Sequence, residues 1–84
     1  MIYYIYVVDA NMRMIGFVSL KDLIMAEPDD LVAKSLHDKF IYGVVDEDQE
    51  AVAERIEKYS LVAIPILNED GQLVGIVSYD NAID

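Results

Sequence analysis

An internal repeat constrains this chain more than any other feature of its sequence. Residues 5–24 and 64–83 superimpose after a shift of 59 positions, which places Gly16 on Gly75. Each copy has an apolar strand, a turn, a second apolar strand that ends in Gly-x-x-Ser, and the first residues of a short helix. The sequence therefore predicts two matching β-hairpin units that fold together.

A strand and a long helix precede the second unit, and nothing equivalent precedes the first. Residues 40–45 are predicted to form the strand, and residues 49–59 show the strongest helical pattern in the chain. Asp46 and Gln49 have the spacing of a capping box at the start of this helix. The apolar residues of the helix share one stripe, formed by Val52, Ala53, Ile56 and Tyr59.

These patterns indicate an α+β fold in which small mixed sheets pack against short helices. We divide the chain into the back half of a first repeat at residues 1–27, a linker with a short helix at residues 28–39, and a complete second repeat at residues 40–84. The first repeat is thus expected to lack its N-terminal half. The apolar run at residues 3–8 is expected to form a strand that is buried on both faces.

The acidic composition limits the partners that the chain is expected to bind. It has 16 Asp and Glu residues against 6 Lys and Arg, which gives a formal net charge of -10. Nucleic acids and anionic membrane surfaces attract Lys and Arg, so neither is an expected partner. The excess of acid is compatible with divalent cations, basic protein partners or solubility alone.

Catalysis, membrane insertion and disulfide bonding find no support in the sequence. The chain has no Cys, and its single histidine, His37, is expected to lie at the surface. No apolar run approaches the roughly 20 residues that a membrane-spanning helix needs. Neither a Walker-type glycine loop nor a dinucleotide fingerprint is present. We therefore expect no enzymatic activity and no direct membrane insertion.

The tandem order of strand, helix, strand, strand and helix, with Gly-h-x-Ser-x-x-Asp near the end of the unit, resembles the CBS (cystathionine-β-synthase-type) domain. In particular, the chain is similar to the cytosolic CBS region of MgtE-type magnesium transporters. This resemblance implies an α+β fold of β-α-β-β-α repeats. Five stretches carry it: Ile2–Asp9, Val18–Ile24, Asp48–Ala53, Ile64–Leu67 and Leu73–Ser78.

The resemblance implies a nucleotide-binding site in the first unit. Ser19 would lie near the phosphates and Asp22 would bind the ribose hydroxyls, but Ser-x-x-Asp is also a capping arrangement that needs no ligand. The second unit has Asn81 in place of Asp22, so if only one site survives, it is expected around Asp22. The other implied contacts are Tyr4 beside the adenine, Lys21 at the phosphates, and Ile41 and Leu61 as walls of the base site. The alternative for Tyr4 is a packed strand residue, and the alternative for Lys21 is an ordinary exposed lysine.

The resemblance also implies a regulatory magnesium site formed by Asp48, Glu50 and Asp84. Mg²⁺ prefers oxygen ligands and keeps much of its water, so separated carboxylates facing a cleft can bind it. By relieving their mutual repulsion, the ion would favour a closed state. The alternative is that Asp48 and Glu50 only complement the positive end of a helix. An EF-hand is excluded because Ala51 stands where the calcium loop needs Gly.

We therefore interpret the chain as a regulatory CBS module of a magnesium transporter or channel, at the cytoplasmic face of the cell membrane. It would sense Mg²⁺, with ATP as a second ligand, and act on a membrane pore outside this chain. A homodimer paired through the short helices of each repeat is expected. Two alternatives stay open: an adenosine-nucleotide sensor of another enzyme or transporter, and a purely structural dimerisation module.

Overall fold

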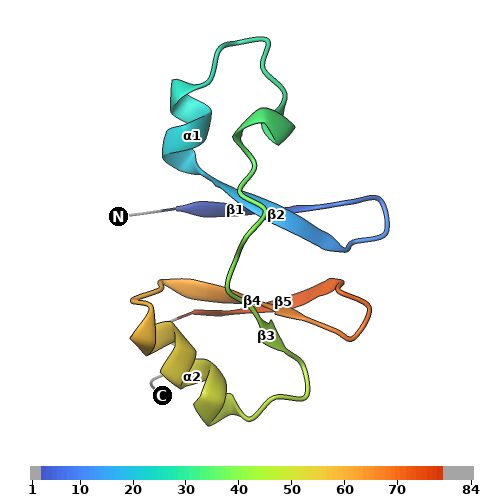
Figure 1. The fold of residues 1–84 in the computed structure, drawn as a ribbon, viewed down its shortest axis with the longest axis vertical. Helices are drawn as coiled ribbons and strands as arrows, with labels where there is room; N and C mark the ends of the chain where they lie inside the picture. Colours follow the sequence, from blue (N-terminus) through green and yellow to red (C-terminus); the bar gives the residue numbers. More distant parts are fainter. Residues whose placement is uncertain (1–2, 79–84) are drawn as a thin grey trace.

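The computed structural model describes residues 3–78, in which two β-hairpins face each other and the helices lie on their outer sides (Figure 1). One sheet has two antiparallel strands, and the other has three strands in the order β3-β4-β5, with β3 parallel to β4. This arrangement confirms the predicted α+β class with small mixed sheets. The strands are β1 (Tyr4–Val8), β2 (Met14–Ser19), β3 (Gly43–Val44), β4 (Ala63–Leu67) and β5 (Leu73–Ser78).

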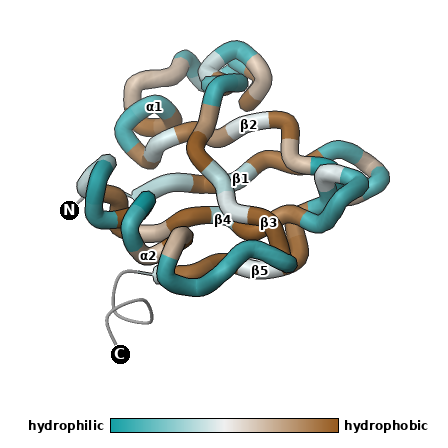
Figure 2. The backbone as a smooth tube through the Cα atoms, turned by 60° about the horizontal axis from the view of Figure 1, so that its bottom comes forward, coloured by the Kyte–Doolittle hydropathy of each residue, from teal (hydrophilic) through white to brown (hydrophobic). Residues whose placement is uncertain are grey.

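Three short helical segments connect the strands. Helix α1 (Leu20–Met25) follows β2, the one-turn 3-10 helix η1 (Val32–Ser35) lies in the linker, and α2 (Gln49–Lys58) precedes β4. In Figure 1, α1 and η1 lie beyond the first hairpin, whereas α2 lies beyond the second. The apolar residues follow the strands, and the turns that connect them are hydrophilic (Figure 2).

The two hairpins repeat one another in structural detail. Each has an irregularity at the same point of its register, between Val7 and Val8 in the first and between Ile66 and Leu67 in the second. The turns are closed in the same way, because the side-chain oxygen of the residue that follows the first strand accepts two backbone amides. Asp9 Oδ1 accepts at 2.9 and 3.0 Å, and its equivalent in the second hairpin, Asn68, accepts at 3.0 and 2.9 Å.

Backbone hydrogen bonds join the two turns to each other. The Met14 amide donates to the Gly71 carbonyl at 3.0 Å, and the Leu73 amide donates to the Met12 carbonyl at 2.9 Å. These two bonds are related by the repeat, since Met14 is equivalent to Leu73 and Met12 to Gly71. Both acceptor residues have positive φ, 66° for Met12 and 81° for Gly71. The pairing fixes one end of the hairpins against each other.

One buried cluster lies where α2 covers the second hairpin, and Met14 and Val18 of β2 are buried as well. Val52, Ile56 and Ile64 form a buried cluster, and Ile56 and Ile64 are at most 1% exposed. The predicted apolar stripe is therefore confirmed for Val52 and Ile56. Tyr59, at the end of the stripe, is 50% exposed.

Burial of the first strand is where the sequence interpretation was wrong. Residues 3–8 were expected to be buried on both faces, yet Tyr4 is 37% and Ile5 is 41% exposed. The repeat supplies the reason, because Ile64 is equivalent to Ile5 and is fully buried by its contacts with α2. Within residues 3–78, the exposed apolar side chains of β1 thus have no cover comparable to the one that α2 gives Ile64.

Two further local predictions were wrong. The expected strand at residues 40–45 is reduced to β3, because only Gly43 and Val44 pair with β4. The expected capping box at Asp46 does not form. Asp48 caps α2 instead, and its Oδ1 accepts the Glu50 amide at 2.9 Å.

The loop before α2 is held by an ion pair with two parallel hydrogen bonds. Arg55 Nη1 and Nη2 donate to Glu47 Oε1 and Oε2 at 2.9 and 2.6 Å. Arg55 Nη1 also donates to the Tyr42 carbonyl at 2.8 Å, and the Val44 amide donates to Glu47 Oε1 at 2.9 Å. The Arg55 guanidinium lowers the pKa of Glu47 from 4.5 to about 2. This contact connects α2 to the segment that leads into β3.

The linker returns to the edge of β2. Phe17 and His37 exchange two backbone hydrogen bonds, with N–O distances of 3.0 and 2.8 Å. Gly16 permits this approach, because a Cβ atom there would lie 2.4 Å from the His37 carbonyl oxygen. The equivalent Gly75 has nothing within 4 Å of the same position. One glycine of the repeat is therefore required by packing and the other is not.

We expect Glu47→Gln to lower the free energy of unfolding by about 1–2 kcal/mol at pH 7, because the charged acceptor of Arg55 is lost. The pKa of Glu47 is depressed in the folded chain, so its carboxylate stabilises the fold above pH 4.5, and this contribution is lost as the pH falls toward 2. Urea unfolding from pH 3 to 7 measures the effect. Glu57→Gln, at an exposed acid of α2, is the control. An equal loss in both variants would show that the ion pair contributes nothing.

We expect Gly16→Ala to lower the free energy of unfolding by roughly 1–3 kcal/mol, because the added methyl group displaces the linker from β2. Gly75→Ala is the matched control, since it makes the same change at the equivalent position of the repeat without a clash. Thermal unfolding of the two variants gives the comparison. Equal stability of both variants would contradict the close packing of the linker.

Candidate functional site

Two adjoining pockets lie on the first hairpin and at its boundary with the second. The inner cleft has a volume of about 150 Å³ and the outer pocket a volume of about 540 Å³. Tyr4 and Phe17 line both. We call the two together the paired pockets.

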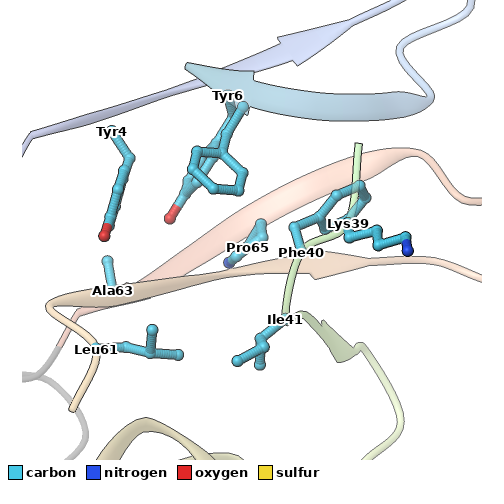
Figure 3. Close-up of a pocket in the computed structure, with 9 residues that line it drawn as sticks. Tyr4, Tyr6, Lys39, Phe40, Ile41, Leu61, Ala63 and Pro65 are labelled. Carbon is cyan, nitrogen blue, oxygen red and sulfur yellow. The ribbon is translucent and has the colours of Figure 1, made fainter. Parts of the chain in front are cut away.

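Aromatic and aliphatic side chains from both repeats form the inner cleft. Figure 3 shows Tyr4 and Tyr6 pointing from β1 toward Ala63 and Pro65 of β4. Burial, together with the nearby hydroxyl group of Tyr4, raises the pKa of Tyr6. The lining residues are Tyr4, Tyr6, Phe17, Lys39, Phe40, Ile41, Leu61, Ala63 and Pro65. Such a largely apolar cleft, lined by aromatic rings, suits a planar ring.

The outer pocket includes the start of α1 and part of the linker. Ser19 and Lys21 supply a hydroxyl group and a positive charge, and His37 supplies an imidazole ring from the linker. The apolar part of the lining consists of Tyr3, Tyr4, Phe17, Leu20, Ile24 and Met25. A ligand with an apolar ring and an anionic tail would therefore find both chemistries across the paired pockets.

Ser19 and Asp22 form a complete capping box at the start of α1. The Asp22 amide donates to Ser19 Oγ at 3.0 Å, and the Ser19 amide donates to Asp22 Oδ2 at 3.0 Å. The interpretation of this pair as a helix cap is therefore confirmed. Its second role, in ligand binding, stays a prediction.

His37 is a site residue that the sequence interpretation missed. Its side chain is 51% exposed, as expected, but its Nε2 lies 2.9 Å from Asp22 Oδ2. Hydrogen bonds from the Ser19 amide and from His37 lower the pKa of Asp22. The imidazole also stacks on the Phe17 ring, with centroids 5.0 Å apart, and Phe17 meets Tyr4 edge to face at 5.1 Å. No sequence signal connects positions 22 and 37, since the contact depends on the return of the linker to β2.

The residues assigned to nucleotide binding by resemblance come together around the paired pockets. The inner cleft gathers Tyr4, Ile41 and Leu61, and the outer pocket gathers Tyr4, Ser19 and Lys21. Asp22 lies beside the outer pocket through its contacts with Ser19 and His37. Tyr6 and Phe17 were missed, although Tyr6 shares a strand face with Tyr4 and pairs with Phe17.

The acids assigned to magnesium lie elsewhere. Asp48 and Glu50 are exposed at the start of α2, where Asp48 acts as the helix cap. Asp84 and Asn81 lie outside the described residues. Among residues 3–78, no group of three or more Asp, Glu or His side chains is placed to hold a metal ion. Any Mg²⁺ bound at Asp48 and Glu50 would need further ligands, such as water.

Within residues 3–78, no helix is both long and apolar enough to cross a bilayer.

Among known proteins, the chain is similar to part of several magnesium transporters. It is 46% identical over 83 residues to a magnesium transporter, MgtE, from Thermus thermophilus, and 43% identical over 83 residues to MgtE from Enterococcus faecalis. Each alignment covers 99% of this chain but 18% of the relative. The chain therefore spans less than a fifth of the length of these relatives.

A solved structure agrees with these relatives in fold and sequence. The cytosolic domain of the Mg²⁺ channel MgtE in complex with ATP matches with a TM-score of 0.90 and 45% identity, over 98% of this chain and 33% of that one. The CBS domain family matches residues 33–84. Because this match covers more than half of the chain, and because the repeat has the matching fold, the chain belongs to the CBS domain family.

Proposed function

We propose that this chain is a regulatory CBS module of a magnesium transporter or channel, that it binds an adenine nucleotide in the paired pockets, and that it responds to Mg²⁺. The observation that carries the proposal is the convergence of Tyr4, Ser19, Lys21, Ile41 and Leu61 on two adjoining pockets. The identity of 46% to a magnesium transporter supports the same assignment.

Different parts of the nucleotide would occupy the two pockets. Adenine would lie in the inner cleft against Tyr4, with Ile41 and Leu61 as walls, because stacking and apolar contact suit a planar base. The phosphates would extend into the outer pocket toward Ser19 and Lys21. Asp22 would accept a ribose hydroxyl. A related cytosolic domain of MgtE has been solved with ATP, which supports this choice of ligand.

The proposed Mg²⁺ site uses Asp48, Glu50 and Asp84. Mg²⁺ commonly keeps several waters and takes one or two carboxylates, so it does not require a closed cage of protein ligands. Asp48 and Glu50 are two positions apart and exposed at the start of α2. The net charge of -10 makes a divalent cation a favourable counterion.

In this proposal the chain acts as a homodimer at the cytoplasmic face of the membrane and controls a pore outside this chain. Apolar side chains on and after α1 support pairing through this region, since Ile24 is 72%, Met25 is 74% and Leu31 is 78% exposed. Burial of such side chains between two copies would be favourable.

The second candidate is a nucleotide sensor that does not respond to Mg²⁺. It is favoured by the pockets, which lie in the described residues, whereas no comparable group of metal ligands does. Separate titrations with each ligand distinguish the two functions.

Asp22→Asn is expected to weaken ATP binding roughly tenfold, because the charged acceptor for ribose is lost. The side-chain oxygen of the introduced asparagine still accepts the Ser19 backbone amide, so the helix cap survives. Calorimetric titration with ATP in EDTA gives the affinity, and Asp29→Asn, an exposed acid in the linker, is the charge-matched control. Unchanged affinity in Asp22→Asn would remove Asp22 from the site, and absence of ATP binding by the unmodified chain would refute the nucleotide proposal.

Mg²⁺ is expected to raise the melting temperature of the unmodified chain beyond the effect of NaCl at equal ionic strength, because a ligand of the folded state stabilises it. The double variant Asp48→Asn, Glu50→Gln should lose this gain while keeping its helix cap, since Asn caps helices as well as Asp. Glu69→Gln with Asp70→Asn, in the second turn, removes the same charge elsewhere. Light scattering measures the oligomeric state of each protein in the same samples. The same response to Mg²⁺ in all three proteins would contradict the metal site.

A further inference from the structure

The single histidine of the chain is held firmly at the wall of the outer pocket. His37 Nε2 lies 2.9 Å from Asp22 Oδ2, its ring stacks on Phe17, and its backbone exchanges two hydrogen bonds with Phe17. The imidazole also lines the pocket beside Ser19 and Lys21. The side chain is therefore placed where a ligand of this pocket would meet it.

The hydrogen bond to His37 uses one oxygen of Asp22 and leaves the other for a ligand. Oδ2 accepts from both the Ser19 amide and His37. Within residues 3–78, Oδ1 has no hydrogen-bond partner. A ligand hydroxyl can thus bind Asp22 while His37 stays in place.

The charge of His37 decides the net charge of this wall. Lys21 and Asp22 on α1 cancel when the imidazole is neutral, and protonation leaves one positive charge. Tyr4 on β1 and Tyr3 just before it add hydroxyl groups, and Phe17 on β2 adds no charge. On the segment of His37 itself, Asp38 and Lys39 have opposite signs. Histidine is the side chain whose charge ordinarily changes between pH 5 and 8.

We propose that His37 makes the binding of phosphate-bearing ligands in the outer pocket pH-dependent. Protonated His37 keeps its hydrogen bond to Asp22, offsets the carboxylate that would repel an anion, and attracts the phosphates. Affinity then rises as the pH falls. This inference rests on the proposed nucleotide site and adds to it a residue that tunes binding by charge.

The test compares ATP and adenosine at pH 8 and pH 6 by calorimetric titration. For the unmodified chain, we expect ATP affinity to rise roughly three- to tenfold on acidification, beyond any change in the control variant. His37→Gln is that control, because its amide can still donate to Asp22 but carries no charge. The control also corrects for protonation of ATP itself. Adenosine, which has no phosphate, should bind with the same pH dependence to both proteins.

Proton NMR provides a second measurement that does not depend on a variant. The chain has one histidine, so its imidazole gives a single set of signals. Saturating ATP should move the titration midpoint of these signals to higher pH, because a ligand that prefers the protonated form must stabilise it in return. A midpoint that ATP leaves unchanged would overturn the inference.

The outcomes separate this inference from the proposal on which it rests. ATP binding with the same pH dependence in the unmodified chain and in His37→Gln overturns the role of His37 and leaves the nucleotide site intact. Absence of binding by ATP and by adenosine at both pH values overturns the nucleotide site and the role of His37 together. A pH dependence that is confined to ATP and lost in His37→Gln supports both.

Discussion

Backbone pairing between Phe17 and His37 is the contact on which the candidate site depends. It brings the linker against the edge of β2, within reach of α1 on one side and of the second hairpin on the other. Without it, the imidazole would not reach Asp22, and the segment that contributes Ile41 to the inner cleft would have no fixed start. The contact is possible because position 16 has no side chain. Glycine there serves the approach of one backbone to another.

The repeat explains why the pockets lie where they do. Paired turns fix one end of the hairpins, and their bonds are related by the repeat, so the two units meet in matching orientations. Beyond that end the symmetry is broken, because α2 packs on the second hairpin and buries Ile64, while Ile5 at the equivalent position is 41% exposed. At this position the first hairpin thus keeps apolar surface for a ligand or a partner, whereas the second hairpin uses the equivalent surface for the core.

Features with a local signal could be predicted from the sequence, and features set by distant contacts could not. The Ser19 cap and the stripe of α2 depend on spacing within one turn or one helix, and both were found. The length of β3 depends on how many residues pair with β4, and the contact of His37 with Asp22 depends on the path of the linker. The grouping of Tyr4 with Ile41 and Leu61 in the inner cleft came from resemblance to a family, because neither periodicity nor spacing connects them.

The Ser19–Asp22 pair can cap the helix and bind a ligand at the same time, because the two roles use different atoms. The capping box uses Ser19 Oγ, the two amides and Asp22 Oδ2. It leaves Asp22 Oδ1 available, while the same hydrogen bonds hold the carboxylate ionised by lowering its pKa. The cap therefore fixes an ionised acceptor at the edge of the outer pocket instead of consuming it. A ligand hydroxyl bound there would add to an existing network, so binding would not require the start of α1 to unfold. This makes the short helix a suitable support for a site despite its length, because its orientation is set by β2 and by the linker together.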